Sequence, residues 1–298
     1  MLLIFLYTST PHQPIHEKKH EMEETQYTVP AFHELFGKCG VIDDWTDAIR
    51  VIVTDINEQK KKVAIFFKTN KSAKFKIVFH ENEWKVHGLY RETSGFLNTK
   101  IHYINGQRHR DHDLPAEISQ DKHGRTYRRW FQRGQAHRDG DLPAFQATHP
   151  NGNVSQMAYY KRGQLHRNGD LPATIRINSD GVIIERRWFK YGLKHRDDDL
   201  PADMYASGRV SEQSWWKNGE LHRDNNLPAR VMNNFDRDDI KKNEQSPLFL
   251  TMVWVQHNKR HREGGLPAME TYNEDGELVK EEWFLNGVKT DAPPPVEP

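Results

Sequence analysis

The residues best suited to chemistry in this sequence are six recurring His-Arg pairs. An imidazole can take up a proton or bind a metal ion, and a guanidinium can hold a carboxylate in a bidentate grip. Leu-Pro-Ala begins four residues after each Arg, and the pairs are spaced by 27 to 29 residues, with one interval of 39. The pairs are formed by His109, Arg110, His137, Arg138, His166, Arg167, His195, Arg196, His222, Arg223, His261 and Arg262.

A kinase-like catalytic loop is the first hypothesis that these pairs raise, because His-Arg-Asp begins at positions 109, 137, 195 and 222. A protein kinase has one such loop, together with a Gly-rich phosphate loop and an Asp-Phe-Gly that binds magnesium. This sequence has no Asp-Phe-Gly, and it repeats the triplet at a structural period. It also has no Ser nucleophile elbow, Walker loop or His-Glu-x-x-His. The motifs therefore do not predict an enzyme.

A zinc site is the second hypothesis that the aligned His residues raise. Zinc needs three or four ligands within about 2.0–2.3 Å, whereas equivalent side chains of stacked repeats lie one repeat apart and face the same way. We therefore expect no metal and no cofactor. A structural framework explains the recurrence instead. In it, the acid after Arg accepts backbone N–H groups, Arg lies across the aromatic ring of a neighbouring repeat or clamps a carbonyl or carboxylate, and His bonds the next copy of the loop.

The residues between the His-Arg loops predict the elements that must position them. A turn residue lies four positions before each Arg, an aromatic pair precedes most of these turns, and a second Gly turn falls midway through each unit. Asn258 stands where the other copies have Gly, as expected for a turn with positive φ. The pattern predicts a mainly β protein, in which tandem β-hairpin repeats of about 28 residues stack into an elongated sheet or β-solenoid.

The repeats also divide the chain. We expect a flexible extension over residues 1–22, a small β-rich N-terminal module over 23–100 and six to seven repeat units over 101–290. An insertion at 232–247 interrupts the array, and a Pro-rich, disordered tail occupies 291–298. Within the module, residues 29–36 predict a short helix, and 48–54, 63–68 and 75–79 predict strands. Residues 84–91 resemble a degenerate repeat end.

Composition excludes several classes of protein. The 298 residues carry a net charge of +1 and contain 11% aromatic residues, so neither a global basic field nor a disordered chain is indicated. Cys39 is the single cysteine, which excludes an internal disulfide framework. No apolar run approaches the roughly 20 residues of a membrane-spanning helix, and the apolar start lacks a basic region and a cleavage site. We expect an intracellular protein with no membrane span.

Nucleic acid is the alternative partner that the sequence suggests. Basic residues stand beside an aromatic residue at two equivalent strand ends, where phosphate contacts and base stacking would combine. Because strand residues alternate between faces, only one member of each aromatic pair needs to be buried. This candidate binding surface consists of Arg128, Arg129, Trp130, Arg186, Arg187 and Trp188. A second alternative is an enzyme or inhibitor in residues 23–100 that the repeats localise.

The repeat resembles the MORN group, in particular its short variant form. The likeness rests on the aromatic-x-x-Asn/Gly-Gly turn followed by a second Gly turn, and it covers roughly residues 100–290. The form Gly-x-x-His-Arg-x-x-Asp-Leu-Pro-Ala is similar to repeats in uncharacterised proteins of large DNA viruses and of phages. The resemblance implies stacked hairpins and no catalytic residues. We expect a non-enzymatic scaffold that mediates protein–protein interaction or assembly, in a host cytoplasm or a virion if the chain is viral.

Overall fold

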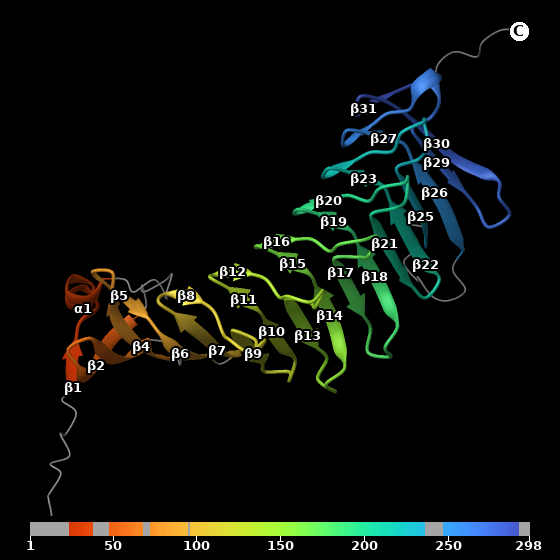
Figure 1. Cartoon of the computed structure of the whole chain (residues 1–298). Helices are drawn as coiled ribbons and strands as arrows, with labels where there is room; N and C mark the ends of the chain where they lie inside the picture. The colour runs from red at the N-terminus through yellow and green to blue at the C-terminus, as the bar shows by residue number, and fades with distance from the viewer. Residues whose placement is uncertain (1–23, 38–47, 68–71, 95, 236–246, 292–298) are drawn as a thin grey trace, which may run out of the picture.

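A long antiparallel sheet forms the body of the protein and confirms the predicted β-repeat architecture (Figure 1). The computed structural model describes residues 24–37, 48–67, 72–94, 96–235 and 247–291. Neighbouring strands pair in hairpin order, and no pairing among these residues joins the first strand to the last, so the sheet is open. The strands of this main sheet, in their spatial order, are β1 (Glu24–Tyr27), β2 (Ala48–Asn57), β3 (Lys60–Phe67), β4 (Ser72–His80), β6 (Gly88–Thr93), β7 (Leu97–Ile104), β9 (Glu117–Asp121), β10 (Thr126–Arg129), β13 (Phe145–Thr148), β14 (Val154–Ala158), β17 (Thr174–Ile177), β18 (Ile183–Arg187), β21 (Asp203–Ser207), β22 (Val210–Ser214), β25 (Arg230–Phe235), β26 (Leu248–Val253), β29 (Met269–Tyr272) and β30 (Leu278–Leu285).

A row of short hairpins lies beside the main sheet, on the inner side of its curve (Figure 1). Each repeat therefore contains two hairpins, whereas the sequence predicts one hairpin and a tight turn. The chain bends after the first residue of the aromatic pair, and this bend separates the long hairpin from the short one. The short hairpins are β11–β12 (Phe131–Gln132, Gln135–Ala136), β15–β16 (Tyr160–Lys161, Gln164–Leu165), β19–β20 (Phe189–Lys190, Leu193–Lys194), β23–β24 (Trp216–Lys217, Glu220–Leu221) and β27–β28 (Val255–Gln256, Lys259–Arg260).

The row continues at both ends of the sheet, where a main-sheet strand is followed by a short strand that pairs with its end. These additional short strands are β5 (Glu83–Val86), β8 (Gln107–Arg108) and β31 (Val288–Thr290). One backbone hydrogen bond joins each short hairpin to the next, as when Gly106 N donates to the carbonyl of Val86 at 2.8 Å. His87 accepts a bond from Asn105 N at 3.4 Å, as the His residues of several later repeats do from the following hairpin. Residues 84–87 thus have the geometry of a repeat end, whereas residues 88–91, which the prediction included, belong to β6 of the main sheet.

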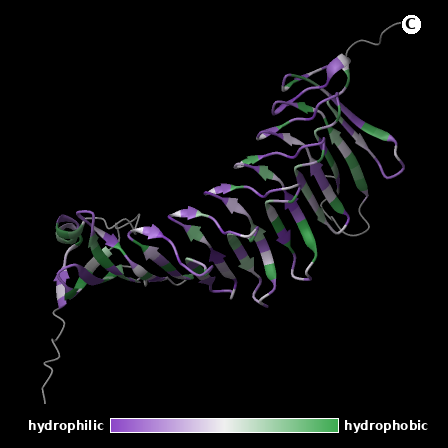
Figure 2. Ribbon diagram, viewed as in Figure 1, coloured by the Kyte–Doolittle hydropathy of each residue, from purple (hydrophilic) through white to green (hydrophobic). Residues whose placement is uncertain are grey.

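The main sheet has two unlike faces. We call the face toward the short hairpins the inner face, since Lys194 of β20 reaches Asp203 on it at 2.5 Å. The opposite, outer face carries Ile118 and Arg128, which are cross-strand neighbours. In Figure 2, hydrophobic and hydrophilic residues are interspersed along the strands, while the connecting loops are largely hydrophilic. Such alternation is typical of antiparallel sheets with two different faces.

The N-terminal module has the largest core. Its helix α1 (Val29–Phe36) begins after Thr28, whose side chain accepts from Ala31 N at 3.4 Å, and it ends at Gly37 with φ of 65°. Phe32 of this helix is fully buried among the inner-face residues Val51, Ile65 and Ile77. The helix and the three strands predicted in this module are confirmed, although residue 68 of the strand predicted at 63–68 lies outside the described residues. No helix in the described ranges is long and apolar enough to cross a bilayer.

Two boundaries predicted from the extent of the repeats do not coincide with the ends of strands. The boundary at residue 100 falls inside β7, which pairs with β6 on one side and β9 on the other, so the sheet runs through it. The insertion expected at 232–247 begins later, because residues 232–235 complete β25 and pair with β26. Residues 236–246 of that insertion, the extension at 1–22 and nearly all of the tail at 291–298 lie outside the described residues.

The tight turns have the predicted backbone geometry. Gly192 has φ of 85° and the residue before it, Tyr191, has φ of 49°, while Asn258 in the exceptional copy has φ of 64°. Two consecutive residues with positive φ are the signature of the type I′ turn. This geometry matches the right-handed twist of the strands and accounts for the Gly residues at this position.

Gly192→Val is expected to lower the free energy of unfolding by about 1–2 kcal/mol, because a side chain at this φ is strained. A Cβ added at Gly192 would lie 3.8 Å from Gln164 Cβ, an ordinary contact, so backbone strain is the main cause. Urea denaturation of both proteins measures the change. Gly192→Asn is the matched control and should cost much less, and an equal loss in both variants would contradict the assigned cause.

Candidate functional site

The His-Arg loop of each repeat folds back over the aromatic residue that ends the long hairpin. In the fourth copy, Trp188 N donates to the carbonyl of Ala202 at 2.8 Å, and His195 N donates to the carbonyl of Trp188 at 3.2 Å. Trp188 is 6% exposed and Ala202 is fully buried. The Ala of Leu-Pro-Ala is at most 1% exposed in every repeat, which explains a small residue there: Ala116, Ala144, Ala173, Ala202, Ala229 and Ala268.

The His side chain bonds within its own loop and to the next repeat. His195 Nε2 lies 2.8 Å from Asp197 Oδ1, and its Nδ1 accepts from Asn218 N of the next short hairpin at 3.1 Å. The backbone N–H fixes the tautomer with the proton on Nε2, so both ring nitrogens are engaged. The own-loop contact, at 2.8 to 3.1 Å, recurs at His109, His137, His166 and His222.

The Arg side chain makes three contacts at once. Arg196 lies over the Trp188 ring at 3.8 Å and donates to the carbonyl of Pro201 at 3.2 Å. It also donates two bonds to Asp170 of the preceding repeat, at 2.6 and 2.5 Å. The same ring and carboxylate contacts are made by the pairs Arg138 with Asp113, Arg167 with Asp141, and Arg223 with Asp199. Each Arg therefore ties its own loop to the loop before it.

The sixth copy has no carboxylate at the usual position of the preceding loop to pair with its Arg. Asn226 stands in place of the Asp, and Arg262 bonds Glu270 instead while still lying over Trp254 at 3.7 Å. Asn226 keeps a role between repeats, because its side-chain oxygen accepts from Glu263 N at 3.2 Å. The link between repeats is thus preserved through a different pair of groups.

The electrostatics of these loops favour the ionised pairs. Hydrogen bonds from Arg138 and from Arg196 lower the pKa of Asp113 and of Asp170, respectively. The pKa of Asp197 is lowered first by His195 and then by Lys190. These carboxylates stay charged throughout the neutral range, so they are poor general acids. The loops described here are arranged to hold repeats together, with most of their polar side chains bonded to one another.

The two Arg-Arg-Trp segments do not form the candidate binding surface that the sequence suggests. Trp130 and Trp188 are each 6% exposed, beneath Arg138 and Arg196, so neither offers a ring for stacking.

The arginines of these segments point to opposite faces of the sheet. On the inner face, Arg129 bonds Glu117, and Arg187 bonds Asp203 at 3.2 Å as well as Glu185. Arg128 and Arg186 lie on the outer face and are separated by several strands. The six residues are therefore divided among the core and two faces.

The leucine of Leu-Pro-Ala is a feature that the sequence analysis missed. These six side chains are 38% to 45% exposed, although the neighbouring Ala is buried in every copy. Their fixed offset from Arg was visible in the sequence, but their exposure was not. We call this set the leucine ridge: Leu114, Leu142, Leu171, Leu200, Leu227 and Leu266.

Comparison with known proteins adds no family to this geometry. The chain matches no known protein-family model and no curated protein sequence. The MORN-like character of the repeat rests on the sequence pattern and remains a prediction, whereas the open sheet of hairpin repeats is shown by the structure.

Proposed function

We propose that the protein is a non-enzymatic scaffold that binds another protein along the leucine ridge. The main support for this proposal is the difference in exposure between the leucine ridge and the other recurring side chains. Most recurring His, Arg and Asp groups bond one another, and the recurring Ala and Trp are buried. A large apolar side chain that remains well exposed in all six copies is what an interaction surface requires.

The spacing of the ridge supports binding to an extended or elongated partner. Successive leucines are two strands apart, which corresponds to roughly 10 Å along the sheet. Because the loops are tied to one another by Arg–Asp pairs, the surface is already formed before binding and loses little conformational entropy. The resemblance to repeats of large DNA viruses and phages favours an assembly inside an infected cell or a virion as part of this proposal.

Affinity capture from the native setting, after nuclease treatment, tests the proposal. The full chain should retain one stoichiometric protein partner. Replacing Leu142, Leu171 and Leu200 together with Gln should reduce the retained partner at least tenfold, because three exposed apolar contacts are removed. Replacing Val182, Leu193 and Leu278 with Gln is the matched control, since these residues are also exposed but lie off the ridge.

Two outcomes would contradict the proposal. Full retention of the partner by the ridge variant, or equal loss in both variants, would remove the leucine ridge as the binding surface. The absence of any stoichiometric protein partner would remove the scaffold function itself.

A further inference from the structure

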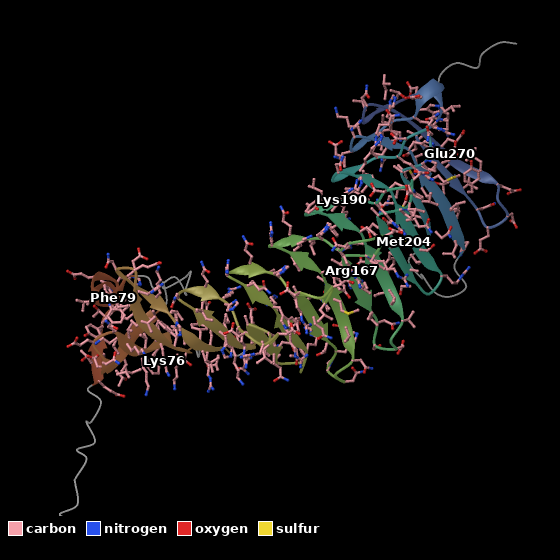
Figure 3. All side chains as sticks on the ribbon, in the orientation of Figure 1. Lys76, Phe79, Arg167, Lys190, Met204 and Glu270 are labelled. Carbon is pink, nitrogen blue, oxygen red and sulfur yellow. The ribbon has the colours of Figure 1, made fainter. Side chains whose placement is uncertain are left out.

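The outer face of the sheet carries a line of basic side chains near the N-terminal end. The strand pairings place Lys74 of β4 opposite Arg91 of β6, and Arg91 opposite Lys100 of β7. Lys100 lies opposite Ile118 of β9, which lies opposite Arg128 of β10. Four of five consecutive positions across the strands are therefore basic. Lys76, two residues beyond Lys74, adds a further exposed charge on the same face (Figure 3).

No carboxylate balances this line among the residues that the structure describes. Lys74, Arg91 and Lys100 are exposed, and none of the four basic residues in the line forms an ion pair with another described residue. The acids of these strands lie on the inner face, where Glu92 accepts from the Tyr90 hydroxyl at 2.7 Å and Glu117 lies 3.2 Å from Arg108. Like charges directly opposite one another destabilise a sheet, so folding alone does not explain the arrangement.

A row of uncharged hydrogen-bonding side chains runs parallel to the basic line on the same face. The pairings place its members on the same strands, each two residues from the position in the basic line. This row consists of Ser72, Thr93, Asn98, Gln120 and Thr126. The outer face at this end thus offers a line of positive charge beside a line of neutral donors and acceptors.

We infer that this outer face binds single-stranded nucleic acid, with its backbone lying across the strands. Neighbouring strands are about 4.8 Å apart, so the basic line extends over roughly 20 Å and matches a linear chain of phosphates. The neutral row can bond sugars and exposed base edges. A bilayer surface is planar and gives no reason for charges to follow one line. Because none of the five positions in the basic line is aromatic, binding depends mainly on phosphate contacts and has little sequence preference.

The inference concerns a different surface from the leucine ridge and does not depend on it. It also differs from the Arg-Arg-Trp hypothesis, with which it shares only Arg128. Further along the same cross-strand row, Gln146, Met157 and Ile175 replace the basic residues before Arg186 is reached. The site is therefore confined to the N-terminal end of the sheet.

Fluorescence anisotropy with labelled 20-nucleotide poly(dT) and poly(U) tests this inference on the full chain. Each phosphate contact to a single strand contributes a slope of about −0.7 to log K against log salt. Four contacts predict about a 50-fold weaker affinity when NaCl rises from about 50 to 200 mM. In the variant Lys74→Gln, Arg91→Gln, Lys100→Gln, one contact remains, and the same change in salt should weaken binding only about threefold.

The matched control removes the same charge from the short hairpins, through Lys161→Gln, Lys190→Gln and Lys217→Gln, and should bind like the wild type. The thermal midpoint of the outer-face variant should not fall, because opposing like charges have been removed. Failure of the wild-type protein to bind either oligonucleotide at about 50 mM NaCl would overturn the inference. So would equal weakening in the control, or binding only to vesicles that contain phosphatidylserine.

Discussion

Replacing Trp188 with Ala is expected to lower the free energy of unfolding by about 3–5 kcal/mol. The indole is 6% exposed and lies at the bend between the long and short hairpins, beneath the guanidinium of Arg196 at 3.8 Å. Its removal leaves a cavity at the junction of two hairpins and takes away the ring on which Arg196 lies. Urea denaturation followed by circular dichroism measures the loss.

Phe189→Ala is the matched control for Trp188→Ala, since Phe189 is the next residue but is only half-buried. It should cost much less, and equal losses in the two variants would contradict the assignment of Trp188 to the core. Trp283→Ala provides a second comparison, because Trp283 lies in the last unit and is also only half-buried. A repeat array is stabilised by neighbours on both sides, so a terminal position should contribute less.

Arg196→Ala is the second large effect that we expect, a loss of about 2–3 kcal/mol. The guanidinium combines a ring contact with Trp188, a bidentate pair with Asp170 and a bond to the carbonyl of Pro201. Arg196→Lys keeps the charge but loses the planar fork, so it should recover only part of the stability. Urea denaturation of the three proteins measures these differences.

A catalytic or ligand-binding role of Arg196 predicts the opposite pattern. In that case the contacts of Arg196 would contribute little to stability, and Arg196→Ala would leave the urea midpoint unchanged within error. Urea denaturation of Arg196→Ala therefore distinguishes a structural role of Arg196 from a role in catalysis or ligand binding.

The repeat architecture was predictable because its signals are local. Gly192 and Asn258 mark turns that need positive φ, and both have it. The extended runs between turns became the paired strands of the main sheet. Such features depend on backbone preferences of one or two residues, which do not change with the tertiary environment.

The role of the Arg residues was predictable in kind but not in detail. The sequence allowed Arg196 either to lie across a ring or to clamp a carbonyl or carboxylate, and the structure shows all of these contacts together. The prediction of a ring from a neighbouring repeat is wrong, because Trp188 belongs to the same repeat as Arg196, whereas the carboxylate of Asp170 belongs to the preceding one. A long side chain reaches several neighbours, so only the stacking of the loops determines which of them it contacts.

The two surfaces proposed here could not be predicted, for different reasons. Exposure of Leu171 depends on how its loop folds over Tyr159, which strand alternation does not specify. The basic line depends on which strands are neighbours. Lys74 and Arg91 meet because β4 pairs directly with β6, although β5 comes between these two strands in sequence. The alternation of residues along a strand predicts which face of the sheet a side chain occupies, but not which strand lies next to it. Side chains distant in sequence therefore could not be placed in one row.

The most direct test of the framework is a double-mutant cycle between Arg196 and Asp170. The account predicts that Arg196→Ala and Asp170→Ala are coupled by about 1 kcal/mol in urea denaturation, because each side chain loses its partner in the neighbouring repeat. A parallel cycle with the exposed Asp198, changed to Asn, should be additive. Additivity within about 0.3 kcal/mol for Arg196 and Asp170 would contradict the account, since the two loops would then not be held together by this pair.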